Sequence, residues 1–241
     1  MEDEDQFISF IHNYCDRWCE RCEFTSRCRV FAMEAEMSDD EKDINNEAFV
    51  RNLSNIFAEA KQMLIEKAEE FGIDLSEESL EEAGVILENK RTATKASPLA
   101  SMAQQYGFDI RPVLESKDEW LVGSDLGQDI IDEVLAVLYW YQFFIGAKVH
   151  RGVYGILDED GNEQWDEIHD IESDANGSIK VALIAIERSI LAWTYLLDAS
   201  NAAVIRPLIE RLETIRQATE KKFPVAREFV RPGFDEIEAV M

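Results

Sequence analysis

The sequence is poor in basic residues. It has 24 lysines and arginines against 50 aspartates and glutamates, which gives a formal net charge of −26 at pH 7. A surface of this charge repels nucleic-acid phosphates and anionic lipid headgroups. We therefore expect neither nucleic acid nor a membrane surface as a partner. The acidic excess favours solubility, and a protein partner with a basic surface stays open.

Common enzyme motifs and targeting signals are also missing. The chain has no nucleophile elbow, phosphate-binding loop or dinucleotide fingerprint. Its first residues, MEDEDQFISF, lack the basic region and long apolar core of a signal peptide, and no apolar run approaches the length that spans a bilayer. These absences favour a cytoplasmic protein without catalysis, and we assign no catalytic residue.

The apolar content predicts a folded, helical protein. Hydrophobic residues make up 46% of the chain and aromatic residues 10%, which is too apolar for a disordered chain. Residues 129–149 and 178–198 are apolar on nearly all sides, so both predict central helices. Pro207 is expected to open a last helix over 207–222. The predicted fold is an all-α bundle built round the two apolar helices.

Other segments show helical spacing or turn residues. Apolar residues between Phe7 and Trp18 predict an N-terminal helix that runs to about residue 22 and bears the cysteines. Ser38 and Glu41 form a predicted capping box, followed by a helix that Gly72 ends. The SDANGS segment offers Asp174, Asn176 or Ser178 as caps for the second apolar helix.

Two further regions complete the predicted organisation. Another helix begins at about Ser76. The stretch 92–124 is expected to hold short helices and turns because it contains Pro98, Gly107, Pro112 and Gly123. Within 152–177 the sequence LDEDGNEQW predicts a turn or small hairpin. We expect residues 1–37 to form a metal-binding helix and turn, and residues 38–241 to form one continuous acidic bundle.

All the cysteines of the chain lie in one short segment. They are Cys15, Cys19, Cys22 and Cys28, in the run CDRWCERCEFTSRC. Thiols stay reduced in the cytoplasm, so such a cluster favours metal or redox chemistry over a structural disulfide. On a helix the first three would share one face, and Cys28 would fold back to complete a four-thiolate cage.

Four arginines accompany the cysteines. They are Arg17, Arg21, Arg27 and Arg29. Guanidinium groups beside thiols favour the thiolate form and offset the negative charge of a four-thiolate site. We therefore expect the arginines to surround the metal ligands and tune the site. The compact spacing favours an iron–sulfur cluster over structural zinc, which prefers two C-x2-C pairs separated by a longer insert.

One part of the segment resembles a known family. The run from Cys19 to Cys28, CERCEFTSRC, has the spacing C-x2-C-x5-C and is similar to the 4Fe–4S segment of the endonuclease III and adenine-glycosylase family. That family has C-x6-C-x2-C-x5-C in an all-helical protein, whereas here three residues replace six in the first gap. The resemblance covers fourteen residues of 241 and includes no Gly-rich helix–hairpin–helix motif. It implies a 4Fe–4S cofactor and no particular activity.

Alternatives remain open for the metal and for the function. The spacing C-x3-C-x2-C also resembles that of radical S-adenosylmethionine enzymes, but those place it after the first strand of a β/α barrel. Our leading hypothesis is a structural or redox-sensing iron–sulfur protein, and the alternative is a zinc-stabilised interaction or scaffold protein. A third hypothesis is an enzyme with a carboxylate pocket formed by Glu133, His169 and Glu187, although pairing of these groups with neighbours is the simpler expectation.

Overall fold

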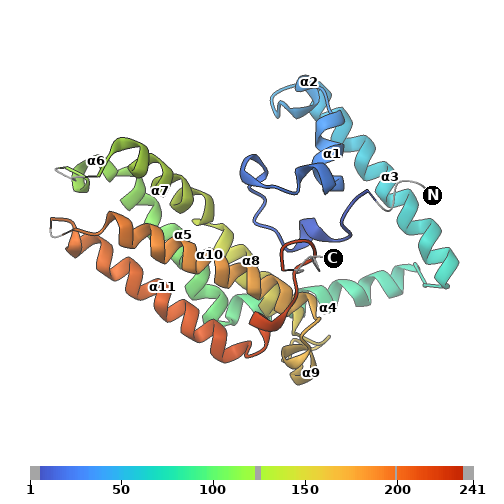
Figure 1. Ribbon diagram of the computed structural model, residues 1–241. Coiled ribbons are helices and arrows are strands. Elements are labelled where there is room, and N and C mark those ends of the chain that lie inside the picture. The colour runs from blue at the N-terminus through green and yellow to red at the C-terminus, as the bar shows by residue number, and fades with distance from the viewer. Residues whose placement is uncertain (1–5, 123–125, 199, 236–241) are drawn as a thin grey trace, which may run out of the picture. The chain divides into compact units, whose positions relative to one another are not determined.

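The computed structural model describes residues 6–122, 126–198 and 200–235 (Figure 1). Within these ranges the secondary structure is helical, and the only β pairing is an isolated antiparallel bridge between Leu157 and Glu163. The predicted all-α class is therefore confirmed.

The chain forms two compact units. The N-terminal unit joins Met1–Ser9 to Cys19–Leu87, and the bundle unit joins Phe10–Trp18 to Glu88–Met241. The boundary at residue 87 falls within a single helix, α4 (Glu77–Ala96). In this division residues 38–87 group with the N-terminal segment, whereas the sequence analysis places them with the bundle.

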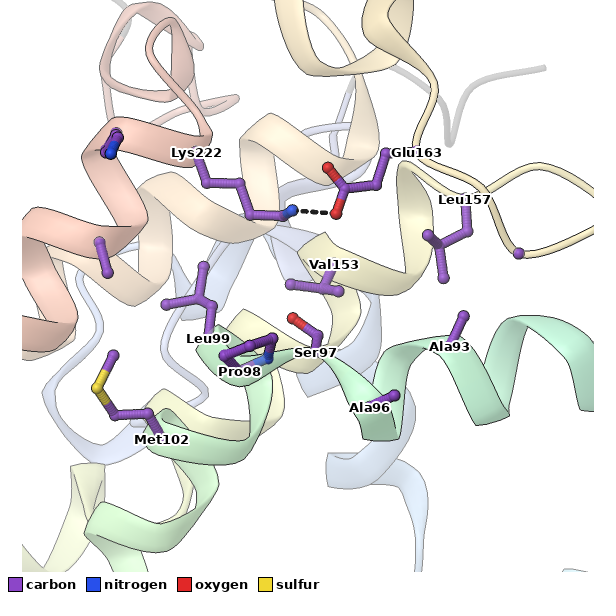
Figure 2. A pocket seen from close by; sticks show the side chains of 13 residues that line it. Ala93, Ala96, Ser97, Pro98, Leu99, Met102, Val153, Leu157, Glu163 and Lys222 are labelled. Atoms are coloured by element: carbon purple, nitrogen blue, oxygen red, sulfur yellow. Dashed lines mark hydrogen bonds and ion pairs between the residues drawn. The ribbon is translucent and has the colours of Figure 1, made fainter.

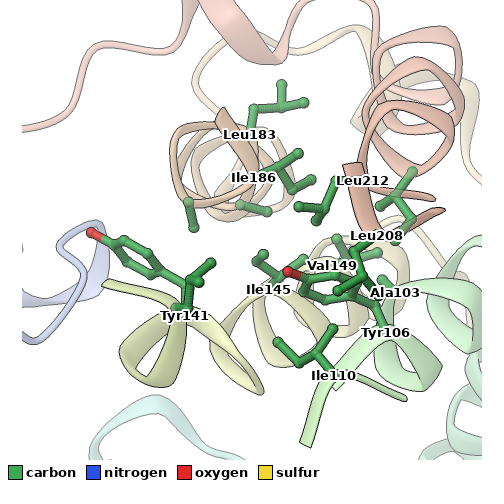
Figure 3. Packing of buried hydrophobic residues seen from close by; sticks show 14 of the residues in the cluster. Ala103, Tyr106, Ile110, Tyr141, Ile145, Val149, Leu183, Ile186, Leu208 and Leu212 are labelled. Atoms are coloured by element: carbon green, nitrogen blue, oxygen red, sulfur yellow. The ribbon is translucent and has the colours of Figure 1, made fainter. Parts of the chain in front are cut away.

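The core of the bundle unit surrounds helix α10 (Asp174–Leu196), which contacts α7 (Gln128–Tyr141), α8 (Phe144–Gly155) and α11 (Ala202–Lys222). A further helix, α5 (Pro98–Glu115), packs on α8 and α11. Figure 3 shows the fully buried side chains of Tyr106, Ile145, Val149, Ile186 and Leu212 meeting between these helices. Side chains on nearly every side of α10 are buried, as its apolar sequence predicts.

The other predicted apolar helix, 129–149, is interrupted. Helix α7 ends at Tyr141 and α8 begins at Phe144. At the interruption the buried Gln142 donates a hydrogen bond from Nε2 to the carbonyl oxygen of Gly107, at 3.0 Å. A β-carbon at Gly107 would lie 2.6 Å from the Gln142 carbonyl oxygen. The backbones of α5 and of this segment therefore meet directly, which hydrophobic periodicity alone does not reveal.

The segment Gln128–Gly155 is long and apolar enough to cross a bilayer by length and composition, contrary to the expectation that no run is. The 18-residue window of this segment that meets the test has a mean hydropathy of 1.4, and 44% of that window is buried inside the protein. The core helices of soluble proteins have the same length and composition.

Proline and glycine mark fewer boundaries than expected. Residues 92–115 are not short helices and turns, because α4 runs to Ala96 and α5 begins after one intervening residue and runs to Glu115, with Gly107 and Pro112 inside it. Helix α11 begins at Ala202, so Pro207 lies within it and does not open it. In both helices tertiary packing outweighs the preference of proline and glycine for turns and helix ends. Gly123 lies outside the described residues.

The polar segment between α8 and α10 forms the predicted turn. The N–H of Asp158 donates to the carbonyl of Asn162 at 2.8 Å, and Gly161 adopts a left-handed φ of 83°. A short helix, α9 (Trp165–His169), follows. The cap of α10 is Ser173, which lies before the predicted caps and accepts from the N–H of Asn176 at 3.2 Å.

Asn176 has a different role from capping. It is fully buried, and its Nδ2 group donates to the carbonyl oxygens of Glu167, Ile168 and Asp170 at 3.2, 3.0 and 2.8 Å. The next residue, Gly177, lies beneath two rings, because a β-carbon there would be 2.4 Å from Tyr14 and 2.7 Å from Phe229. Asn176 is therefore fixed by the segment just before α10, and Gly177 by rings from distant parts of the bundle unit.

The expected N-terminal α-helix is absent from residues 7–22. Two single 3₁₀ turns, Ile11–Asn13 and Cys19–Arg21, occupy this stretch, and Phe10 and Arg17 both have φ of 60°. The apolar side chains that suggested a helix use separate partners. Ile11 is buried, Tyr14 packs on Phe229 at 4.6 Å, and Trp18 stacks on Trp140 at 5.0 Å. These separate contacts hold the segment in place, and it does not form the helix that the apolar spacing predicts.

The long helix of the N-terminal unit matches the prediction at its C-terminal end. Helix α3 (Glu47–Phe71) ends at Gly72, which adopts φ of 66°. The capping box of Ser38 and Glu41 is present, but it begins the four-residue helix α2 (Asp39–Lys42), and Asn46 caps α3. Helix α1 (Arg29–Glu36) precedes them. The apolar face of α3 is largely exposed, and Ala68 is its one fully buried residue.

Candidate functional site

Two of the four cysteines share one turn of the N-terminal unit. Cys19 begins the 3₁₀ turn Cys19–Arg21, and the N–H of Cys22 donates to the carbonyl oxygen of Cys19 at 3.2 Å. A C-x2-C pair is a recurrent element of structural metal sites, and both side chains here are partly exposed. The backbone of this pair is thus held by its own hydrogen bond.

The third cysteine of this unit lies at a helix start. Cys28 is the N-terminal cap residue of α1, and its N–H closes a second turn by donating to the carbonyl of Thr25 at 3.3 Å. The positive end of a helix dipole favours negative charge at this position. In the same unit, the N–H of Ile8 donates to the carbonyl of Arg27 at 2.9 Å and ties the start of the chain to this turn.

Cys15 belongs to the bundle unit. Its Sγ donates to the carbonyl oxygen of His12 at 3.5 Å, and its side chain lines a cavity of about 70 Å³ together with Tyr141, Arg188 and Arg231. Burial raises the pKa of the Cys15 thiol, and the neighbouring Arg17 opposes that shift in part. The surroundings of Cys15 in the bundle unit therefore disfavour its thiolate form in the absence of a metal.

A preformed metal-binding group is not found among the side chains that the structure describes. Across residues 6–122, 126–198 and 200–235, no three His, Cys, Asp or Glu side chains are arranged to hold a metal ion. All four cysteines fall within these ranges, and none of them forms a disulfide. Four thiols are a donor set suited to a thiophilic metal, and Cys19, Cys22 and Cys28 lie at short turns of the N-terminal unit.

The four arginines expected around the ligands are all exposed. Arg17 lies in the bundle unit, and Arg21, Arg27 and Arg29 lie in the N-terminal unit. Only Arg17 shows an electrostatic effect on one of the cysteines, namely on Cys15, among the shifts resolved for the described residues.

A polar cluster that the sequence did not predict lies beside Cys15. The Tyr141 hydroxyl donates to Asp16 Oδ2 at 2.7 Å and accepts from Arg188 at 2.6 Å, and Arg188 also donates to Asp16 at 2.8 Å. The Trp140 indole donates to the Asp16 carbonyl at 2.9 Å. The one sequence feature that pointed to this cluster is Arg188, a charged residue on the apolar helix α10. The sequence does not reveal that its partner is Asp16, 172 positions away.

Several other charged or titratable residues of the bundle unit have partners of their own. Lys180 pairs with Asp235 at 2.7 Å, and Arg188 pairs with Asp16, so each cation already has a carboxylate. Glu187 pairs with Arg227 at 2.5 Å, and His169 stacks on Trp165 at 4.0 Å. Within the described residues, Glu133, His169 and Glu187 belong to no group of three ligands that could hold a metal ion.

No family model, no curated protein and no solved structure matches this chain.

Proposed function

We propose that the chain binds a thiolate-ligated metal centre, most simply a 4Fe–4S cluster, through Cys15, Cys19, Cys22 and Cys28. The observation that carries the proposal is the Cys19–Cys22 turn, which presents a C-x2-C pair on a hydrogen-bonded backbone. Cys28 follows after a second turn at the start of α1. The centre would act as a structural element or a redox sensor in the reducing cytoplasm.

Chain length supports the inclusion of Cys15. Only three residues separate it from Cys19, so their Cα atoms can be at most about 14 Å apart. Metal ligation by thiolates is coupled to local folding and to loss of the thiol protons. We expect metal binding to draw the sulfur atoms of this segment together. Arg17, Arg21, Arg27 and Arg29 would offset the negative charge of the ligands.

The test is metal analysis of protein purified without air. The expected product is brown, absorbs broadly at roughly 400 nm, and contains iron and acid-labile sulfide in equal amounts. A colourless protein with stoichiometric zinc would replace the iron–sulfur assignment with the zinc alternative. Protein with neither metal, even after reconstitution with iron and sulfide, would overturn the proposal.

Single substitutions assign the ligands. Cys22→Ser should lose the absorbance and the metal, because it removes one half of the turn pair. Ser26→Ala is the matched control, since Ser26 is an exposed residue of the same segment that supplies no ligand. Cys15→Ser tests the fourth position. Full metal content in that variant would show that Cys15 is not a ligand.

The exposed apolar row on α3 favours a second candidate function, the docking of a helical partner protein. Val50, Phe57, Leu64 and Phe71 recur at seven-residue intervals, and they are 59%, 66%, 71% and 71% exposed. This interval is the repeat of a helix–helix seam. The net charge of −26 disfavours a second copy of this chain on the seam and favours a basic amphipathic helix.

A designed peptide pair tests this docking. A helical peptide with leucine on one face and lysine on the other should bind the protein, and the same peptide with glutamate in place of lysine should not. Phe57→Ser with Leu64→Ser should weaken binding at least tenfold. Leu191→Ser with Tyr195→Ser, two exposed positions on α10, should leave it unchanged. Equal losses in both variants, or a concentration-dependent homodimer through α3, would contradict the candidate.

A further inference from the structure

A large apolar pocket lies in the bundle unit, apart from the cysteines. Its volume is about 740 Å³, and its walls come from α4, α5, α8, α11 and the turn that follows α8. This volume is within the range of about 300–1,000 Å³ found for small-molecule sites. Figure 2 shows Leu99, Met102, Val153 and Leu157 facing the space, with Ala93 and Ala96 at its side.

Small side chains create the space. Ala93 and Ala96 on α4 and Ala218 on α11 line it where a larger residue would fill it. Gly161, also in the lining, adopts φ of 83°, and a β-carbon there would lie 3.0 Å from the Ala93 side chain. The turn is held against α4 by a hydrogen bond from Asn89 Nδ2 to the Glu159 carbonyl at 3.3 Å. The pocket is therefore part of the packed bundle unit.

Three charged residues belong to the lining of the pocket. Lys221 and Lys222, from the last turn of α11, line it together with Glu163. Lys222 pairs with Glu163, as Figure 2 shows. Lys221 is exposed and forms no ion pair with any residue that the structure describes. A pocket in this acidic chain thus offers an uncompensated cation beside apolar walls.

We propose that this pocket binds a linear aliphatic carboxylate such as a medium-chain fatty acid. The alkyl chain would contact Leu99, Met102, Val153 and Leu157, where burial of each methylene group removes apolar surface from water and favours binding. The carboxylate would pair with Lys221, while Glu163 keeps Lys222 in place. Charge complementarity favours the anion. A cationic amphiphile would meet the positive charge of Lys221, and the carboxylate in the lining, Glu163, is already paired with Lys222.

Direct binding to the full chain tests the proposal. Decanoate is the probe, measured by isothermal titration calorimetry, with decyltrimethylammonium as the ligand of the same chain and opposite charge. We expect saturable 1:1 binding of decanoate and at least tenfold weaker binding of the cation. Equal affinity for the two, or a decanoate Kd weaker than roughly 1 mM, would overturn the proposal.

Variants separate the pocket from general effects of charge and bulk. Lys221→Gln should weaken decanoate binding about tenfold, whereas Arg206→Gln removes the same charge from α11 about 22 Å away and should not. Ala96→Trp should abolish binding by filling the pocket, and Ala147→Trp adds the same bulk at an exposed position of α8 outside it. Circular dichroism verifies that each variant is folded. Binding that survives Ala96→Trp, or falls equally in Arg206→Gln, would refute the site.

Discussion

Arg188 Nη1 lies 2.8 Å from Asp16 Oδ2, although 172 residues separate them along the chain. The Tyr141 hydroxyl completes the contact by donating to the same carboxylate oxygen and accepting from the same guanidinium. These contacts hold residues 10–18 on the bundle unit without any regular secondary structure in the segment beyond one 3₁₀ turn.

Tyr141→Phe is expected to loosen this segment. Burial raises the pKa of Tyr141 to about 12, so the hydroxyl remains a donor at neutral pH. Its removal should lower the free energy of unfolding by about 1–2 kcal/mol and speed hydrogen exchange in residues 10–18. Urea denaturation and exchange mass spectrometry measure the two effects. Tyr195→Phe, at a side chain 58% exposed, is the control, and equal effects in both variants would contradict the role of Tyr141.

Two glycines should respond in opposite ways to alanine. At Gly107 the new β-carbon would lie 2.6 Å from the Gln142 carbonyl oxygen and 2.8 Å from the Phe143 ring, so the helices must move apart. We expect Gly107→Ala to destabilise by about 1–3 kcal/mol. Gly84 has nothing within 4 Å of that position, so Gly84→Ala should stabilise α4 by about 0.5–1 kcal/mol. Thermal denaturation compares them, and the same sign for both would refute the close approach of α5.

Asp235 should contribute stability that depends on pH. Burial alone would raise the pKa of this carboxyl, but hydrogen bonds from Arg231 and Lys180 outweigh burial and hold its pKa below the usual range. A lowered folded-state pKa gives stability that is present above the unfolded-state pKa of about 3.9 and lost as pH falls below it. Asp235→Asn should therefore cost about 1–2 kcal/mol at pH 7 and progressively less below pH 4.

Denaturation at a series of pH values measures this difference. Asp118→Asn provides the comparison, because the Asp118 side chain is 93% exposed and its nearest cation is 3.9 Å away. A cost of Asp235→Asn that stays constant from pH 7 to pH 2 would contradict the ion-pair account.

Removal of the proposed metal should act locally. If thiolates of residues 15–28 hold a metal, a chelator should raise hydrogen exchange across the turns and α1, whereas the buried middle of α10 should stay protected. Exchange measured by mass spectrometry before and after chelation resolves the two regions. Uniform loss of protection across α10 would instead indicate that the metal supports the whole fold.

The spacing of apolar residues and the position of glycine predicted elements that depend on the sequence of the element itself. Helix α10 is apolar on all sides and is central, and α3 ends at Gly72 because glycine adopts the left-handed conformation there. The same reasoning failed for residues 7–18. There Ile11, Tyr14 and Trp18 match a helical repeat, but Ile11 is buried, Tyr14 packs on Phe229 and Trp18 stacks on Trp140 without a helix. Such contacts depend on residues more than a hundred positions away.

The cysteine spacing gave part of the candidate site. It identified Cys19 and Cys22 as a pair, and the structure places them in one turn. The helical face expected to carry Cys15 with them does not form, because Arg17 has a left-handed φ and Cys15 packs beside Tyr141 and Arg188. The pocket beside Lys221 gave no sequence signal, since alanines at helical spacing equally predict ordinary packing.

The Asn176–Gly177 pair has a consequence for the chemical ageing of the protein. Asparagine followed by glycine is prone to deamidation, because the glycine N–H attacks the side-chain amide and closes a succinimide ring. Here Asn176 lies in the first turn of α10, and its fully buried amide donates to three carbonyl oxygens of the segment that precedes the helix, so the reaction requires that turn to open. The aspartate that results would set a negative charge against those same carbonyls and oppose reclosure. A slow gain of one mass unit at this position would therefore record how often the start of α10 unfolds.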